Sequence, residues 1–261
     1  MLKRQEGQAV VEAAVVLPAM IFLLLLTIQL TQLQQARIMA EYAAFTAART
    51  GIVMNGNNGT GSGGLDGPMH SAAVLAILPT FGRTDSPSHI TTTLAKFTAQ
   101  DGLLKPFGLS QVRVFVHNPV ARDFKTFGGH LNGQEIDFDD ARPEANEAAL
   151  LSLQVRYLYE LRVPFANRMI QTIWLATKAG VLGTWGGFNW SSPRFGTQSG
   201  PDAVALSRAI ASSITVKDGT PEGIPLAGLV AAGAANRFFL PVEAFYTMRM
   251  QSNPYLKWAH Q

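Results

Sequence analysis

Cysteine is absent from the 261 residues, so disulfide bonds and thiolate metal sites are excluded from the architecture. Charged residues are also scarce, at 15% of the chain, and lysine plus arginine exceed aspartate plus glutamate by only three. So small an excess gives no basis for nucleic-acid binding, which requires clustered positive charge. A chain of this length can still bury a stable core without crosslinks.

The short motifs of common hydrolases are missing as well: Gly-x-Ser-x-Gly, Ser-x-x-Lys and His-Glu-x-x-His do not occur. The five histidines show no metal-ligand spacing. A Gly- and Asn-rich stretch at 55–64 follows an expected helix instead of a strand, which argues against a phosphate-binding loop. We therefore predict no catalytic residues, no metal and no cofactor, and a chain that is not an enzyme.

One acidic patch leaves two interpretations open. Calcium prefers several carboxylate oxygens, and His130 lies nearby in the sequence, but the full spacing of a calcium loop is lacking. The alternative is a solvated acidic turn. The patch consists of Asp137, Asp139, Asp140, Glu144 and Glu147.

Long hydrophobic runs, by contrast, are present at one place only, near the N-terminus. After the basic residues Lys3 and Arg4, the stretch 13–30 carries no charge, and eleven of its eighteen residues are Val, Leu, Ile or Phe. These eleven contribute about −3 to −7 kcal/mol to membrane insertion, enough to outweigh Pro18 and Gln29. Since eighteen residues nearly match a hydrocarbon core of roughly 30 Å, the stretch predicts a membrane-spanning helix.

The positive residues before the span favour a cytoplasmic N-terminus, which places the remainder of the chain in the periplasm or outside the cell. A cleavable secretory signal is disfavoured because no Ala-x-Ala site follows the apolar run. The helical pattern continues instead, without glycine or proline, until Gly51. We expect one helix from about Ala9 to Thr50, roughly 60 Å long, of which half projects beyond the bilayer.

The opening Glu6-Gly7-Gln8-Ala9-Val10-Val11-Glu12-Ala13-Ala14-Val15-Val16-Leu17-Pro18 resembles the TadE-like proteins of the tight-adherence (Tad, or Flp pilus) system. Type IV pilins and pseudopilins share a basic leader that ends in glycine and a glutamate fifth in the mature chain. The resemblance implies cleavage after Gly7 by a prepilin peptidase, with Gln8 as the new first residue and Glu12 as the fifth. Gln8 departs from the wider class, where major pilins usually carry phenylalanine.

Glu12 and Pro18 are the candidate assembly residues, each with an alternative. Intramembrane acids tend to be paired or functional, so Glu12 could neutralise the new ammonium on Gln8 of a neighbouring subunit. Otherwise Glu12 lies at the cytoplasmic boundary and reaches water. Pro18 removes a helical hydrogen bond and could help the helix bend or melt during extraction into a fibre, or it is a neutral kink.

The remainder of the chain predicts an antiparallel sheet. Apolar residues alternate with polar ones at 112–116, 153–163 and 240–250, which favours strands with one packed face and one wet face. The projecting half of the first helix is the natural cover for the packed face. We expect the contact to be made by Leu33, Met39, Tyr42 and Phe45.

Other segments complete the expected α+β, pilin-like fold. A Gly- and Asn-rich linker is expected over 53–68, and a helix over 69–78 between two prolines. Helices are also expected at 168–179, as a core or membrane-surface element, and at 203–213. The apolar stretch 226–235 is too short to cross a membrane. The aromatic loop 185–190, with Phe195, is either a contact surface or pinned to the core.

Together these features predict a minor pseudopilin with a leader (1–7), a transmembrane and projecting helix (8–52), the linker and an exported domain (69–261). The resemblance implies an inner-membrane, single-pass protein, possible incorporation in the pilus, and four partners: the prepilin peptidase, the major Flp pilin, other minor pseudopilins and the inner-membrane assembly platform. The alternative is an uncleaved single-span protein whose periplasmic domain binds an envelope partner or a surface ligand.

Overall fold

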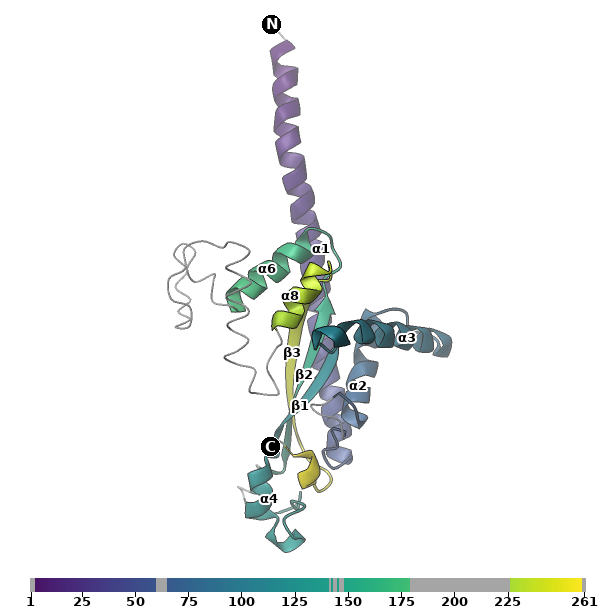
Figure 1. Ribbon diagram of the computed structural model, residues 1–261, viewed down its shortest axis with the longest axis vertical. Helices are drawn as coiled ribbons and strands as arrows, with labels where there is room; N and C mark the ends of the chain where they lie inside the picture. The colour runs from purple at the N-terminus through teal and green to yellow at the C-terminus, as the bar shows by residue number, and fades with distance from the viewer. Residues whose placement is uncertain are drawn as a thin grey trace.

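The computed structural model describes residues 3–59, 65–140, 142, 145, 148–178 and 226–259. One long helix, α1 (Lys3–Val53), dominates it, and Pro18 lies inside this helix without ending it. Figure 1 shows the N-terminal half of α1 standing free above a globular part, while its C-terminal half lies along the sheet. The expected α+β class and the pilin-like arrangement of helix and sheet are confirmed.

The sheet has three antiparallel strands in the order β1–β2–β3: β1 (Val112–Asn118), β2 (Leu150–Glu160) and β3 (Phe239–Arg249). Val114 pairs with Val155, which pairs in turn with Ala244. All three strands lie where the alternating sequence patterns predicted them, although β2 begins and ends three residues earlier than 153–163. The central strand therefore joins β1 to β3, whose paired residues Val114 and Ala244 are 130 positions apart in the chain.

Alanines bring α1 onto the sheet. Six of them lie on one side of the C-terminal half of the helix and are almost completely buried: Ala36, Ala40, Ala43, Ala44, Ala47 and Ala48. Side chains this small let the helix backbone approach β2 and β3 closely. The close approach extends to Gly51. A Cβ added at this position would lie 2.5 Å from both Leu151 Cδ2 and Met69 Sδ, too close for a larger residue to fit without a shift.

The larger residues expected to make this contact are more peripheral. Leu33 packs against the edge of the core, and Phe45 meets Tyr246 edge-on with ring centroids 5.4 Å apart. Met39 is half-buried, whereas Tyr42 remains 54% exposed. The expectation was wrong for Tyr42 because the alanine stripe, rather than the bulky residues, faces the strands.

The second face of the sheet is buried at β2 but open at β3, where Glu243, Phe245 and Thr247 are exposed, so the expected wet face is only partly present. Gln154 and Arg156 of β2 are each only 5% exposed. Arg156 donates to Glu243 Oε1 at 3.2 Å and lies over the Phe115 ring. Further along this face, a second apolar cluster includes Leu158 and Phe239 together with residues of helices α6 and α8. Burial here is possible because the charged group is paired.

Additional helices surround the sheet. The expected helix after the linker is α2 (Pro68–Ile77), which packs on α1 and runs into a 3₁₀ turn at Leu78–Thr80. The expected helix at 168–179 is α6 (Ala166–Lys178), and 226–235 forms α8 (Leu226–Ala234). The helices α3 (Pro87–Leu104) and α4 (Ala121–Phe127) were not predicted. Further 3₁₀ turns lie at Lys105–Phe107, Gly129–Leu131 and Leu256–Trp258.

The described start of the expected linker contacts the sheet. The Asn55 side chain donates to Asn253 O at 2.7 Å, and the Asn58 side chain donates to Val114 O at 3.0 Å. These bonds tie the chain after α1 to the C-terminal segment and to β1. The expected helix at 203–213 and the aromatic loop at 185–195 lie outside the described residues.

Candidate functional site

The exposed half of α1 is the most unusual surface of the molecule. Large apolar side chains cover it on every side, and no residue of its most apolar stretch is buried. Val15 is 71% exposed, Met20 66% and Leu23 66%. A surface of this kind is stable only where lipid or other apolar helices replace water. The helix is long and apolar enough to cross a membrane.

Polar residues inside this half satisfy themselves locally. The Thr27 hydroxyl donates to Leu23 O at 2.9 Å, and the Thr31 hydroxyl donates to Thr27 O at 3.0 Å. Such bonds to the preceding helical turn leave no hydroxyl donor that requires water. The two threonines are therefore compatible with an apolar surrounding, where unpaired polar groups are costly.

The predicted processing and assembly residues all lie in this half. Gly7 and Gln8 belong to the first turns of α1, Glu12 is exposed one turn after Gln8, and Pro18 lies further along the same continuous helix. Positions 8 and 12 are four apart and so occupy the same helical face. Helix geometry thus places Glu12 beside the terminus that cleavage after Gly7 would create.

Gln29 marks the end of the exposed half, and the sequence analysis missed its role. Its side chain has no exposed surface, and Oε1 accepts a hydrogen bond from Val163 N at 2.8 Å. One turn on, Gln32 Oε1 accepts from the Tyr159 hydroxyl at 3.3 Å. Burial raises the pKa of Tyr159, which keeps this hydroxyl protonated as a donor. The only available sequence signal was an uncharged polar residue at the end of an apolar run.

The acidic patch gives no metal geometry among its described members. Asp137 Oδ1 accepts from Asp139 N at 3.0 Å, and Asp140 pairs with Arg142. Glu144 and Glu147, and the side chain of His130, lie outside the described residues. Within the described part of the chain, no group of three His, Asp or Glu residues is placed to hold a metal ion.

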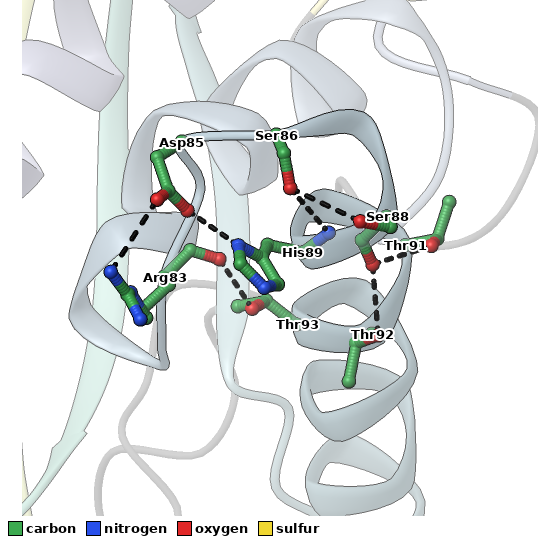
Figure 2. Close-up of polar contacts among 8 residues, drawn as sticks. All are labelled: Arg83, Asp85, Ser86, Ser88, His89, Thr91, Thr92 and Thr93. Atoms are coloured by element: carbon green, nitrogen blue, oxygen red, sulfur yellow. Dashed lines mark hydrogen bonds and ion pairs between the residues drawn. The ribbon is translucent and has the colours of Figure 1, made fainter.

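An aspartate–histidine pair at the start of α3 has a structural explanation. His89 Nδ1 lies 2.6 Å from Asp85 Oδ1, and Arg83 pairs with the other carboxylate oxygen (Figure 2). Ser86 accepts from the His89 backbone N–H at 3.3 Å, as a helix N-cap does. All of these groups lie on the surface around the cap, where the Ser86 and Ser88 hydroxyls hydrogen-bond to each other at 3.1 Å. The cluster begins a helix and does not form a nucleophile site.

A comparison with known protein families matches most of α1, across both its exposed half and its packed half. Residues 7–49 match the family model of the TadE-like proteins. The match confirms the resemblance drawn from residues 6–18, and it ends four residues before the last residue of α1. No curated protein and no solved structure matches the chain.

The TadE-like segment indicates a membrane protein associated with the Tad pilus. This family consists of structural or assembly components of pili and has no known enzymes. The segment contains Gly7, Gln8, Glu12 and Pro18, together with the alanine stripe that packs on the sheet. The family match and the exposed apolar surface therefore point to the same element, α1.

Proposed function

We propose that the chain is a minor pseudopilin of a Tad (Flp) pilus, cleaved by a prepilin peptidase after Gly7 and assembled through α1. The exposed apolar half of α1 carries the proposal, because it offers one continuous surface to lipid before assembly and to neighbouring helices afterwards. The family match, which begins at Gly7, supports the same processing point.

In this proposal α1 spans the inner membrane with Lys3 and Arg4 in the cytoplasm. The globular part then lies in the periplasm, or outside the cell once the subunit enters a fibre. Its partners are the prepilin peptidase, the major Flp pilin, other minor pseudopilins and the assembly platform of the inner membrane. In this proposal an adhesive role belongs to the assembled fibre.

Glu12 has the central role in assembly. Cleavage after Gly7 creates an ammonium group on Gln8, and burial of both charges between helices favours their pairing across two subunits. Pro18 lies six residues further on, where a missing helical hydrogen bond makes local bending easier. A bend at this point would let successive helices adjust to one another in the fibre.

The mature N-terminus tests the processing step. Protein purified from its native membrane is analysed by mass spectrometry of the N-terminal peptide. We expect the chain to begin at Gln8 in cells with an active peptidase and at Met1 in cells without it. A Met1 terminus in both strains would overturn the pseudopilin proposal and favour an uncleaved, anchored binding protein.

Substitution of Glu12 tests the assembly step. Glu12→Gln keeps the size and polarity but removes the charge, and Glu41→Gln is the matched control on the exposed side of the packed half. We expect Glu12→Gln to be cleaved and inserted normally but to reduce pilus assembly by about tenfold or more, since a lost charge pair of 1.4 kcal/mol or above changes an equilibrium by that factor. Normal assembly with Glu12→Gln would show that the carboxylate has no such role.

A further inference from the structure

An exposed apolar stripe lies on α6 and on the residue just before it. Phe165 is 75% exposed, Met169 43% and Ile173 44%. These positions are four residues apart, so they share one face of the helix. The opposite side of α6 is buried at Gln171 and Leu175, and Ile170 and Trp174 pack on the core beside the stripe. The stripe is therefore a surface without a cover among the described residues, on a helix whose other side is anchored.

The stripe begins where the exposed half of α1 ends. Val163 N donates to the buried Gln29 side chain, and Phe165 follows two residues later. Two residues of extended chain span at most about 7 Å, so Phe165 lies close to the level of Gln29. Figure 1 shows α6 directly below the point where α1 leaves the globular part. If the bilayer surrounds the exposed half of α1, the boundary of that bilayer passes beside Phe165.

The backbone holds the Phe165 side chain in this position. Phe165 has φ 64°, in the left-handed region that bulky residues rarely adopt. It follows Pro164, and its carbonyl accepts from Met169 N at 3.3 Å, so the unusual residue leads directly into α6. A strained backbone that exposes an aromatic ring to water would gain nothing by itself. The conformation is better explained if the ring has an apolar surrounding.

The charges around the stripe fit a lipid surface. Arg162 precedes Phe165 in the chain and Arg168 follows it; both are exposed, and the Arg162 guanidinium also donates to Thr80 O at 3.3 Å. Arginines next to an exposed aromatic residue are typical of the membrane interface, where phosphates attract the guanidinium groups and the ring enters the headgroup region. A protein partner would not require this pattern to coincide with the end of a membrane span.

The geometry points to a second membrane contact: Phe165 and the exposed face of α6 rest on the outer leaflet of the bilayer that α1 crosses. This inference depends on the membrane-spanning placement of α1 proposed above. The contact would fix the tilt of the globular part against the membrane surface. Extraction of α1 into a fibre would then have to release two lipid contacts, the span and the α6 face.

Spin labelling can test the contact in the full chain, because the absence of cysteine allows single labels to be introduced. Phe165→Cys is compared with Leu23→Cys in the span and with Leu75→Cys, an exposed residue of α2 that is 57% accessible. Each labelled protein is reconstituted in vesicles of phosphatidylethanolamine and phosphatidylglycerol. The measurement is the collision rate with oxygen, which concentrates in lipid, relative to that with a water-soluble nickel complex.

We expect the oxygen-to-nickel ratio at position 165 to be several-fold above that at position 75 and below that at position 23. A ratio equal to that at position 75, with position 23 in lipid, would overturn the α6 contact alone. Water-like values at position 23 would overturn the spanning placement as well. A label at 165 that is shielded from both reagents and broadened by a second label would assign the stripe to another copy of the chain and also overturn the lipid contact.

A second variant separates the contact from folding. Asparagine adopts the left-handed conformation more easily than phenylalanine, so Phe165→Asn should leave the fold intact. In this background a label at Ile173→Cys should become several-fold more accessible to the nickel complex, because the aromatic anchor is lost. The matched background Leu75→Asn should leave the label unchanged. Unchanged accessibility in the Phe165→Asn background would show that Phe165 does not hold α6 at the membrane.

Discussion

The two halves of α1 reverse the usual relation between hydrophobicity and burial. The N-terminal half carries most of the leucines, valines and isoleucines of α1 and leaves them exposed or half-buried, whereas the C-terminal half buries alanines against the sheet. The reversal is explained if the two halves face different surroundings. Contact with lipid gains from large apolar area, while contact with a sheet requires small side chains that let two backbones approach.

The junction between the two halves of α1 is held by side-chain hydrogen bonds. Gln29 and Gln32 connect α1 to Val163 and Tyr159, close to the start of α6. The globular part is thus fastened to the helix along its packed half and at the junction, but not above it. A subunit built in this way can move the exposed half of α1 from lipid to neighbouring helices, while the packed half of α1 keeps the same contacts.

Among substitutions that test this difference between the halves, an arginine in the exposed N-terminal half of α1 should have the largest effect. Leu24 and Ile38 are similarly exposed, at 57% and 63%, but lie in different halves. Leu24→Arg replaces a favourable residue with a costly one and should weaken membrane insertion by about 3–4 kcal/mol, whereas Ile38→Arg should not change it. The measurement is the fraction of protein that stays in the membrane after alkaline extraction.

Equal behaviour of these two arginine variants would contradict a difference in surroundings between the two halves of α1. If both were extracted, the lipid-facing surface would have to include Ile38, beyond the Gln29 junction. If both stayed in the membrane, the upper half would not be in hydrocarbon, and insertion would depend on another part of the chain. Only a loss confined to Leu24→Arg agrees with a boundary at Gln29.

Overpacking of the lower half should have the next largest effect. Ala44 is completely buried against the sheet, and Ala44→Leu adds three carbons where α1 and the strands are already in contact. We expect the free energy of unfolding of the globular part to fall by about 1–3 kcal/mol. Urea unfolding of the full chain in detergent micelles measures this loss.

The same substitution in the exposed half is the control. Ala19→Leu should leave the unfolding of the globular part unchanged, since Ala19 is exposed and belongs to the half of α1 that stands free of the globular part (Figure 1). A destabilisation by Ala19→Leu as large as that by Ala44→Leu would mean that the upper half also packs on the globular part. The distinction between the halves would then be lost.

Removal of the junction should have a smaller effect. Gln29→Ala leaves the buried Val163 N–H without its acceptor, and the net loss of one such hydrogen bond is about 1 kcal/mol. The exposed Gln35 gives the matched control, Gln35→Ala, for which no change is expected. Hydrogen exchange at the Val163 amide should become faster only in Gln29→Ala. Unaltered exchange would show that the bond does not contribute to fastening the two parts.

Sequence analysis was most successful where one physical requirement dominated a whole segment. A run of eighteen uncharged residues has few alternatives to a membrane helix, and long period-2 alternation has few alternatives to a strand. The alanines at 36, 40, 43, 44 and 47 could also be seen in the sequence as one side of a helix. Their role could not, because burial by small residues depends on which surface they meet.

The sequence was less informative where tertiary contacts decided the outcome. The polar positions of β2 suggested a wet face, yet Arg156 is buried because Glu243 and Phe115 lie across the neighbouring strands. The helix α3 was missed because its threonine-rich first half, Ile90–Thr93, has weak helix propensity. Its cap, Ser86 followed by Pro87, was the signal that could have revealed it.

The smallest expected effect is a pH dependence of the free energy of unfolding that arises from α2, the helix packed on α1. His70 lies on α2, which packs on α1, and its burial lowers its pKa despite the nearby carboxylates of Asp101 and Asp66. The unfolded chain therefore binds a proton more readily, so the free energy of unfolding should fall as the pH drops below about 6.5. Urea unfolding in micelles at several pH values should show this decline in the native chain and a weaker one in His70→Gln. His89→Gln, at the exposed start of α3, is the control and should retain the native decline. A decline equally strong in His70→Gln would show that another group titrates and that protonation of His70 does not lower the free energy of unfolding.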